Sequence, residues 1–499
     1  MSDNQHRVIV VGSGPAGAMA ALKLVQCGVP VIMLESGETP PGGILLRVMD
    51  KTLFRRVPEV PKYDHYVPGD DPSAVWVKSL EPGGLSNYWT GAIPRFAPED
   101  FVEGERLHER YRWPIGYDDL ARHYDYAEEV LGVVAGELSV PAVPAPSPSR
   151  RFRKVPDDWK RLGGFAEKQG QAIIPTPTAG ADAWMLKRSG TGAAFDSFSG
   201  IVQRLLRSPL FELKLNAHAL KLEWSGQKKK LTGAVYFDRR ERVEKRVEAA
   251  AVVLGAGSLA STKLLFDSAC ADFPQGIGNE RGVLGKFMHD HTMVSYEVHF
   301  EKPITATSHS MYLTRNAYEG SVPLMAAGAT MFTSRSKRES INALLGGTTQ
   351  CMGGGIFGSV IPSEQSNVRP HGTEKDEFGL PKLLMNFRYT EQEKRNVVQA
   401  FHALVQVLDA AGHRCRTAPG DPEVWPPGSS VHLGGTVRMH ESPQHGVLDR
   451  WNRAYAVPNL IVVDASCFTT SSEKNPTLTA MALSARAAEQ LAADLKRAS

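Results

Sequence analysis

The stretch Val8-Ile9-Val10-Val11-Gly12-Ser13-Gly14-Pro15-Ala16-Gly17, close to the start of the chain, decides the fold. Its first four residues are all β-branched and apolar, which is typical of a strand buried on both faces of a parallel sheet. A helix-forming stretch follows at 18–27, and a second apolar strand follows at 29–34. This order predicts a strand–helix–strand unit.

The glycines of this unit have the spacing G-x-G-x-x-G, and Glu35 closes the second strand eighteen residues after Gly17. Such glycines permit a tight turn, close approach of the backbone to a pyrophosphate and close packing of the helix, whose N-terminus favours negative charge. An acidic residue placed like Glu35 accepts hydrogen bonds from ribose hydroxyls. The pattern therefore predicts a dinucleotide site, but it does not separate NAD from FAD.

The bulk composition predicts an ordinary globular protein. A chain of 499 residues is long enough for about two or three domains. Hydrophobic residues make up 42% and charged residues 22%, which argues against disorder. The 57 Lys and Arg nearly balance the 54 Asp and Glu, so we expect no nucleic-acid partner. No apolar run reaches about 18 residues, so we expect no membrane-spanning helix.

The cysteines and the first residues bear on the compartment. The five cysteines are scattered and never form C-x-x-C, so neither a disulfide framework nor a zinc site is indicated. The first residues lack the features of a secretory signal, and we expect a cytoplasmic protein. His289 and His291 could share a strand face, but no third ligand is apparent, so no metal is predicted.

Further periodic segments complete the expected fold. We expect strands at 211–215, 250–254, 382–389 and 460–463, and helices at 391–411 and 478–495. The proline-rich stretch 138–150 favours an extended surface linker. Segment 301–350 has weak periodicity, and we interpret it as an insertion or mobile loop.

Three C-terminal stretches stand out: Val431-His432-Leu433-Gly434-Gly435-Thr436, Leu460-Ile461-Val462-Val463-Asp464-Ala465-Ser466 and Lys474-Asn475-Pro476-Thr477-Leu478-Thr479. Together they resemble the signature of the glucose-methanol-choline (GMC) oxidoreductases, and the likeness is closest to the pyranose oxidase branch. Residues 83–90, 252–258 and 285–291 match further motifs of the family, in the family's order. The resemblance implies an FAD-dependent enzyme that acts on CH–OH groups.

By this resemblance, His432 and Asn475 are the catalytic pair in front of the flavin. Moving a hydride from a carbinol carbon to flavin N5 requires the hydroxyl proton to leave, and an imidazole can accept it. Asn475 can hold the hydroxyl oxygen without adding charge. His440 is a rival base eight residues further on, and His432 could instead be a satisfied structural histidine.

The resemblance also implies how the flavin is held. Tyr88 stands where a branch with covalent flavin has the linking histidine, so we expect non-covalent FAD. Thr90 matches a threonine near flavin N5, although the stretch around it could be only a structural turn. The candidate cofactor-binding residues are Gly12, Gly14, Pro15, Ala16, Gly17, Glu35, Ser86, Asn87, Tyr88, Thr90, Gly91, Ala92, Ala219, Gly257, Asp464, Ala465, Asn475 and Thr477.

The expected fold class is α/β, or α+β overall: a Rossmann-like FAD-binding domain with a substrate-binding domain on an antiparallel sheet. We expect the FAD-binding domain to be discontinuous, made of 1–100, 205–300 and 425–499. The substrate-binding domain would comprise 101–204 and 301–424, including the insertion near 301–350.

The expected reaction converts a secondary alcohol of a sugar or glycoside to the keto-sugar, with oxygen or another electron acceptor. The chain looks more like the bacterial glycoside 3-oxidases than the fungal pyranose oxidases, which favours C3 over C2. Tyr63, Tyr66 and Trp76 could line the sugar site, or they could be packing residues. The alternatives are an enzyme for a non-sugar alcohol and a non-redox protein like the hydroxynitrile lyases.

Overall fold

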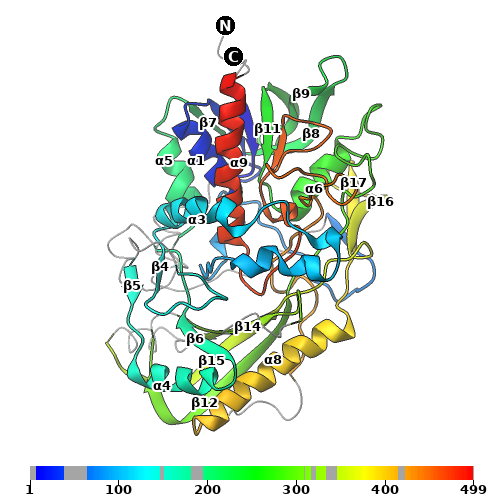
Figure 1. The fold of residues 1–499 in the computed structure, drawn as a ribbon. Coiled ribbons are helices and arrows are strands. Elements are labelled where there is room, and N and C mark those ends of the chain that lie inside the picture. The colour runs from blue at the N-terminus through cyan, green and yellow to red at the C-terminus, as the bar shows by residue number, and fades with distance from the viewer. Residues whose placement is uncertain are drawn as a thin grey trace.

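Two large sheets organise the chain (Figure 1). The computed structural model describes residues 7–38, 65–145, 151–180, 195–307, 310–315, 322–332, 345–413 and 422–497. Within these ranges, no helix combines the length and the apolar character that crossing a membrane would require.

The first sheet is wholly parallel and contains the strand predicted at the start of the chain. Its strand order is β18 (Leu460–Val462), β11 (Ala251–Leu254), β1 (Val8–Val11), β2 (Val31–Leu34) and β7 (Phe211–Lys214). Every residue of β1, β2 and β11 is buried, which explains why each is a continuous apolar run. The strand–helix–strand prediction is therefore confirmed.

Helices cover this sheet. Helix α1 (Pro15–Gln26) packs along α9 (Thr477–Arg497), which runs through the upper half of the molecule, and α3 (Tyr117–Leu131) packs on α9 (Figure 1). Many of the buried residues of α1 and α9 are alanines, and such small side chains allow two helix backbones to approach closely. The Ser484 hydroxyl donates to the Ala16 carbonyl at 2.6 Å. Helix α6 (Ser258–Asp267) follows β11 directly.

The second sheet is antiparallel throughout, as expected for the substrate-binding part of the fold. Its order is β12 (Thr292–Thr305), β15 (Thr348–Gly358), β14 (Ala327–Phe332), β13 (Met311–Arg315) and β6 (Gln171–Pro175). Helices α4 (Asp157–Glu167) and α8 (Glu391–Ala410) share an apolar core with one face of this sheet (Figure 1).

The expectation of a loop at 301–350 is wrong for the residues that the structure describes, because they contribute to β12, β13, β14 and β15. The glycines of β15 weaken the pattern by which a strand is predicted from sequence. A Cβ on Gly354 would lie 1.7 Å from the carbonyl oxygen of Thr330 and 2.7 Å from the Tyr296 hydroxyl. The Tyr296 side chain occupies the space that a side chain at position 354 would need, so only glycine fits there. Glycine is otherwise unfavourable inside a strand.

Smaller elements complete the chain. The strand predicted at 382–389 ends at Asn386, and the segment 138–145 turns through a bridge between Val140 and Val143. The remaining strands are β3 (Tyr66–Pro68), β4 (Val134–Gly136), β5 (Arg151–Arg153), β8 (Ala217–Ser225), β9 (Lys230–Asp238), β10 (Val243–Glu248), β16 (Asn367–Lys375) and β17 (Pro381–Asn386), and a short helix α5 spans Gln203–Leu205. We propose a two-domain division along the predicted lines, except that the boundary expected after residue 300 falls inside β12 (Thr292–Thr305), which belongs to the antiparallel sheet.

Candidate active site

A cavity of about 440 Å³ lies at the carboxyl ends of the parallel strands. Its lining includes the turn after β1, the residue after β2 and the turn after β11. It continues to Phe357 on β15 of the second sheet and to His432 and Asn475. Ligands of open parallel sheets bind at this edge.

The turn between β1 and α1 brings backbone to the cavity wall. Gly12 has φ 94°, and a Cβ there would lie 2.7 Å from the Gly255 carbonyl oxygen. By contrast, a Cβ on Gly14 would meet nothing closer than 3.9 Å. A side chain at Gly12 is therefore excluded by the protein, whereas one at Gly14 would compete only with a ligand. Pro15 begins α1, so the free N–H groups of the helix face the same space.

Glu35 is buried beside this turn, immediately after β2. One carboxylate oxygen accepts from the Ser13 amide at 3.0 Å and the Ser13 hydroxyl at 2.6 Å. The other accepts from the Gly37 amide at 2.8 Å. These bonds hold the carboxylate in one orientation and leave acceptor capacity toward the cavity, as binding of a ribose requires.

Asp464 organises the opposite wall after β18. One of its oxygens accepts from the Gly257 amide at 3.1 Å and the Ser261 hydroxyl at 2.5 Å, and the other accepts from the Ser466 amide and hydroxyl. The aspartate thus ties the turn after β11 to the turn after β18. These bonds position backbone at the cavity wall, which Asp464 itself also lines.

The hydrogen-bond donors and acceptors along the cavity suit FAD. One end offers the amides of a helix N-terminus for a pyrophosphate and a carboxylate for a ribose. The other end is lined by the first residue of α9, Thr477, and by Pro476 before it, so a second helix N-terminus meets that part of the wall. The phosphate turn, Glu35, Ser86, Tyr88 and Thr90 would hold the cofactor.

His432 and Asn475 meet at the far end of this cavity. The Asn475 Nδ2 lies 2.9 Å from the His432 Nε2, and both residues line the cavity. Burial and the neighbouring His291 lower the pKa of His432 well below its ordinary value, which keeps the imidazole neutral. A neutral imidazole can accept a proton, so this pair has the composition of a general base and an oxygen-binding amide.

The backbone of His432 is held by a buried carboxylate. Asp290 accepts from the His432 amide at 3.0 Å and from the Gly428 amide at 2.9 Å, and it also accepts from the Ser430 hydroxyl. Val431 has φ 59°, a strained conformation for a β-branched residue. These bonds to Asp290 stabilise the turn that presents the imidazole.

Most predicted cofactor residues line the cavity, and two do not. Gly17 packs behind the turn, where a Cβ would lie 2.1 Å from the Gly12 carbonyl oxygen. Asn87 is buried, and its amide donates to the Pro82 carbonyl at 3.1 Å. The residues at the cavity wall are Gly12, Gly14, Pro15, Ala16, Glu35, Ser86, Tyr88, Thr90, Gly91, Ala92, Ala219, Gly257, Asp464, Ala465, Asn475 and Thr477.

His440 lies outside the cavity lining. Its Nδ1 accepts from the Ser442 amide at 2.9 Å, so the proton of the neutral ring is on Nε2, which donates to the Glu109 carbonyl at 3.0 Å. Both nitrogens are used, as in a structural histidine.

Of the three aromatic residues considered for a sugar site, Tyr66 lines the cavity and Trp76 is buried against Phe387. Tyr63 lies outside the described residues.

The sequence assigned no part in the redox chemistry to two residues next to His432. Phe357 of β15 lines the cavity with its ring 5.3 Å from that of His432. His291 lies behind His432, with 2.9 Å between the two Nδ1 atoms. His291 belongs to the matched motif 285–291, which was the available signal, but it was considered only as a possible metal ligand, because no sequence pattern places it against His432.

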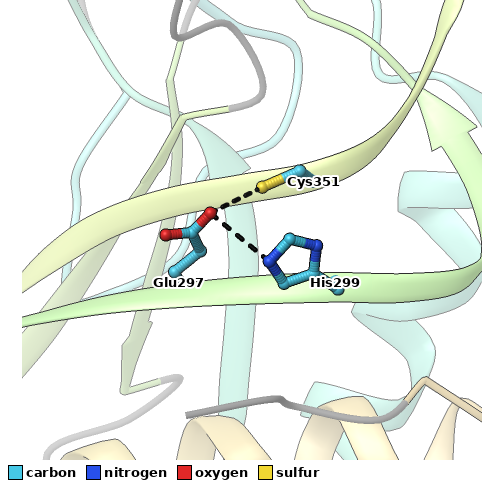
Figure 2. Close-up of side chains that lie close together, drawn as sticks. All are labelled: Glu297, His299 and Cys351. Atoms are coloured by element: carbon cyan, nitrogen blue, oxygen red, sulfur yellow. Dashed lines mark hydrogen bonds and ion pairs between the residues drawn. The ribbon is translucent and has the colours of Figure 1, made fainter. Parts of the chain in front are cut away.

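Among the described residues, one group of three could hold a metal ion. Figure 2 shows Glu297 and His299 on β12 and Cys351 on β15. A Glu297 oxygen lies 3.4 Å from the His299 Nε2 and 3.2 Å from the Cys351 Sγ. These contacts account for the arrangement without an ion, because the carboxylate pairs with both neighbours. The side chains of Glu297 and His299 are nearly half exposed, and none of the three residues lines the cavity.

The fold and this cavity define an FAD-dependent oxidoreductase with a histidine–asparagine pair. Comparison with known families supports that class: residues 5–41 match an FAD binding domain, and residues 362–484 match the GMC oxidoreductase family. These matches support a GMC-type oxidoreductase, a class of flavoenzymes that act on CH–OH groups.

Curated relatives align over nearly the full length. The chain is 28% identical to 2-methyl-1,2-propanediol dehydrogenase of Mycolicibacterium austroafricanum, covering 98% of this chain and 96% of that protein. Identity is 27% with paromamine 6'-oxidase of Streptomyces fradiae (99% and 92%) and 24% with C-glycoside 3-oxidase of Arthrobacter globiformis (98% and 96%). Pyridoxine 4-oxidase from Mesorbium loti has a similar fold, with TM-score 0.67 at 18% identity over 98% and 99% of the two chains.

Proposed function

We propose that the enzyme oxidises a secondary alcohol of a sugar or glycoside, with C3 favoured over C2, and that His432 is the base. The observation that carries the proposal is the pairing of His432 Nε2 with Asn475 Nδ2 at 2.9 Å, in the same cavity as the dinucleotide turn. FAD supplies the hydride acceptor. His432 accepts the hydroxyl proton while the carbinol carbon loses its hydride, which bound FAD would accept, and the C–O bond becomes C=O.

Each residue of the pair has a defined part in this proposal. The neutral His432 accepts the proton at Nε2, and the Asn475 amide donates to the substrate oxygen. Because the Asn475 amide is uncharged, it does not repel the imidazolium that forms when His432 accepts the proton. The residue types thus match oxidation of a neutral alcohol.

The sugar preference is supported by relatives and not by the cavity. Paromamine 6'-oxidase and C-glycoside 3-oxidase both align over almost the whole chain. The C3 preference depends on the second of these relatives. A non-sugar alcohol is the second candidate, favoured by the 28% identity to 2-methyl-1,2-propanediol dehydrogenase.

Anaerobic mixing with substrate tests the proposal. A glycoside, the free sugar and 2-methyl-1,2-propanediol should be compared at equal concentration, and we expect the glycoside to bleach the flavin absorbance fastest. Deuterium at C3 should slow the bleaching, whereas deuterium at C2 should not. Bleaching by the diol alone would assign a non-sugar substrate. Cleavage of a cyanohydrin without bleaching by any alcohol would assign the non-redox alternative.

We also propose that FAD is bound non-covalently in a cytoplasmic enzyme whose acceptor is oxygen or another oxidant. Tyr88 lines the cavity at the position of the linking histidine, and a phenol cannot form a histidyl–flavin bond. Acid precipitation should leave yellow FAD in the supernatant; a coloured pellet would contradict this attachment. The described cysteines Cys27, Cys270 and Cys467 form no disulfide, which suits a reducing compartment.

A further inference from the structure

A buried histidine stands directly behind His432. His291 immediately precedes β12, and its ring meets that of His432 edge to face, with the centroids 4.8 Å and the two Nδ1 atoms 2.9 Å apart. Two neutral rings in this contact hold one proton between these nitrogens. Whichever ring carries that proton determines whether Nε2 of His432 is a donor or an acceptor.

The contact at the other ring nitrogen of His291, Nε2, indicates which of the two Nδ1 atoms carries the proton. Its Nε2 lies 2.9 Å from the Ser471 hydroxyl, and that hydroxyl donates its single proton to the Ser472 carbonyl at 2.9 Å. Ser471 therefore accepts from an N–H at Nε2 of His291. Burial lowers the pKa of His291 to about 4, so the neutral ring has no second proton. Its Nδ1 is consequently a bare acceptor.

The alternation of donors and acceptors then continues to the cavity. Since Nδ1 of His291 accepts, Nδ1 of His432 must donate, and Nε2 of the neutral His432 carries a lone pair. The Asn475 amide donates to that lone pair. In this series of hydrogen bonds, from the Ser472 carbonyl to the Asn475 amide, no donor faces another donor. Such an arrangement is the usual way in which the bond at one ring nitrogen sets the tautomer at the other.

We propose that His291 is a positioning residue: together with Ser471 it holds the proton of His432 on Nδ1 and so keeps Nε2 available to the substrate hydroxyl. The use of Nε2 as a base rests on the proposed function, but the tautomer does not. Charged neighbours do not override this arrangement, because Glu473 raises and Lys474 lowers the pKa of His291, and these two side chains form an ion pair at 3.0 Å.

The backbone of His291 is held by hydrogen bonds that do not involve its ring nitrogens. The Tyr389 hydroxyl donates to the His291 carbonyl at 2.8 Å, and the Ser430 hydroxyl accepts from its amide at 3.3 Å. Substituting the ring should therefore change the proton position on His432 while the backbone keeps these anchors.

Nitrogen NMR of the ¹⁵N-histidine holoenzyme tests the tautomer directly, and the His432 signals are assigned by their loss in His432→Gln. We expect a protonated Nδ1 and an unprotonated Nε2 in the wild type, and loss of this preference in His291→Leu. A wild-type proton on Nε2, or an unchanged preference in the variant, overturns the proposal. This readout needs no turnover, so it remains valid if His432 proves not to be the base.

Anaerobic flavin reduction gives the kinetic test. His291→Leu should reduce FAD about 10- to 100-fold more slowly, the cost of losing a residue that orients a functional histidine, with little change in substrate affinity. His291→Asn places an oxygen acceptor near the lost Nδ1 and should recover most of the rate. Equal rates in the two variants would indicate a role in packing alone and overturn the proposal.

Two further variants complete the comparison. His123→Leu removes another buried histidine, whose Nε2 lies 3.1 Å from a Glu489 carboxylate oxygen. His123 does not line the cavity, so this variant should leave the rate of flavin reduction unchanged. Ser471→Ala removes the acceptor that fixes the His291 tautomer. It should slow reduction in the same direction as His291→Leu but by less, and it tests the proposal even if the leucine variant fails to fold. A Ser471→Ala rate equal to that of the wild type would count against the relay.

Discussion

The two ends of the cavity are built in different ways. At the phosphate end, the consecutive residues 12–16 line the cavity with backbone, beside the carboxylate of Glu35. At the redox end, side chains arrive from 289–291, 430–432 and 471–475, which are far apart in the sequence. The first end depends on backbone conformation and space, whereas the second depends on proton positions. Substitutions should therefore separate cofactor binding from chemistry.

The sharpest separation is expected from His432→Ala. This variant should retain FAD and its fold, because the phosphate end is untouched, yet reduce flavin about 10²- to 10⁴-fold more slowly, the usual contribution of positioned proton transfer. Anaerobic stopped-flow reduction measures this step apart from reoxidation. Reduction at the wild-type rate would remove His432 from the role of base.

The opposite separation is expected from Gly14→Val. The added side chain would enter the open space in front of the turn, where a Cβ has no protein atom within 3.9 Å. It would exclude one or two charge-assisted bonds to phosphate, which corresponds to a loss of FAD affinity of about 10- to 100-fold. Flavin absorbance per protein after purification measures occupancy.

Gly163→Val is the matched control for Gly14→Val. Gly163 lies on α4, and a Cβ there meets no atom within 4 Å. This control should purify with full flavin. Full occupancy in Gly14→Val as well would contradict the assignment of the turn to the pyrophosphate.

This contrast also explains what the sequence could predict. The phosphate end was predictable because Gly12, Gly14 and Glu35 act through local spacing along one strand–helix–strand unit. His432 and Asn475 were identified through family motifs, because nothing in their spacing shows that two residues 43 positions apart lie 2.9 Å from each other.

The sequence prediction missed features that depend on contacts between residues far apart in the chain. Residues 348–358 form a strand in which Gly354 is demanded by Tyr296 and Thr330 of neighbouring strands, and no single-sequence pattern reveals such a partner. His291 was missed for a similar reason, since its role depends on which ring it faces. Long-range side-chain contacts, more than local propensities, therefore limited the prediction.

A smaller loss is expected from Asn475→Ala. It removes one hydrogen bond to the substrate oxygen, about 0.5–1.5 kcal/mol, or roughly 2- to 10-fold in the reduction rate. In the double variant with His432→Ala the losses should be less than additive, because both residues act on one hydroxyl. Strict additivity in stopped-flow reduction would show that the two side chains act independently.

The pH dependence should be flat over the neutral range. Because burial and His291 lower the pKa of His432 well below 6.5, the neutral base is fully populated at neutral pH, and its protonation in acid should decrease the reduction rate. The decline should therefore appear on the acid side of 6.5. Reduction rates measured across pH in the wild type check the sign, and a midpoint above 6.5 would contradict it.

The smallest effect is expected at His440, the rival base. Both of its ring nitrogens are bonded, to the Ser442 amide and the Glu109 carbonyl, and it lies outside the cavity lining. His440→Gln should therefore change stability more than flavin reduction, with FAD content unchanged. Loss of a satisfied buried hydrogen bond costs about 1 kcal/mol, measurable as a lower denaturant midpoint. If His440→Gln instead abolished flavin reduction while His432→Ala did not, the base would have to be reassigned, and the chemistry would lie outside the cavity that the dinucleotide turn shares with Asn475.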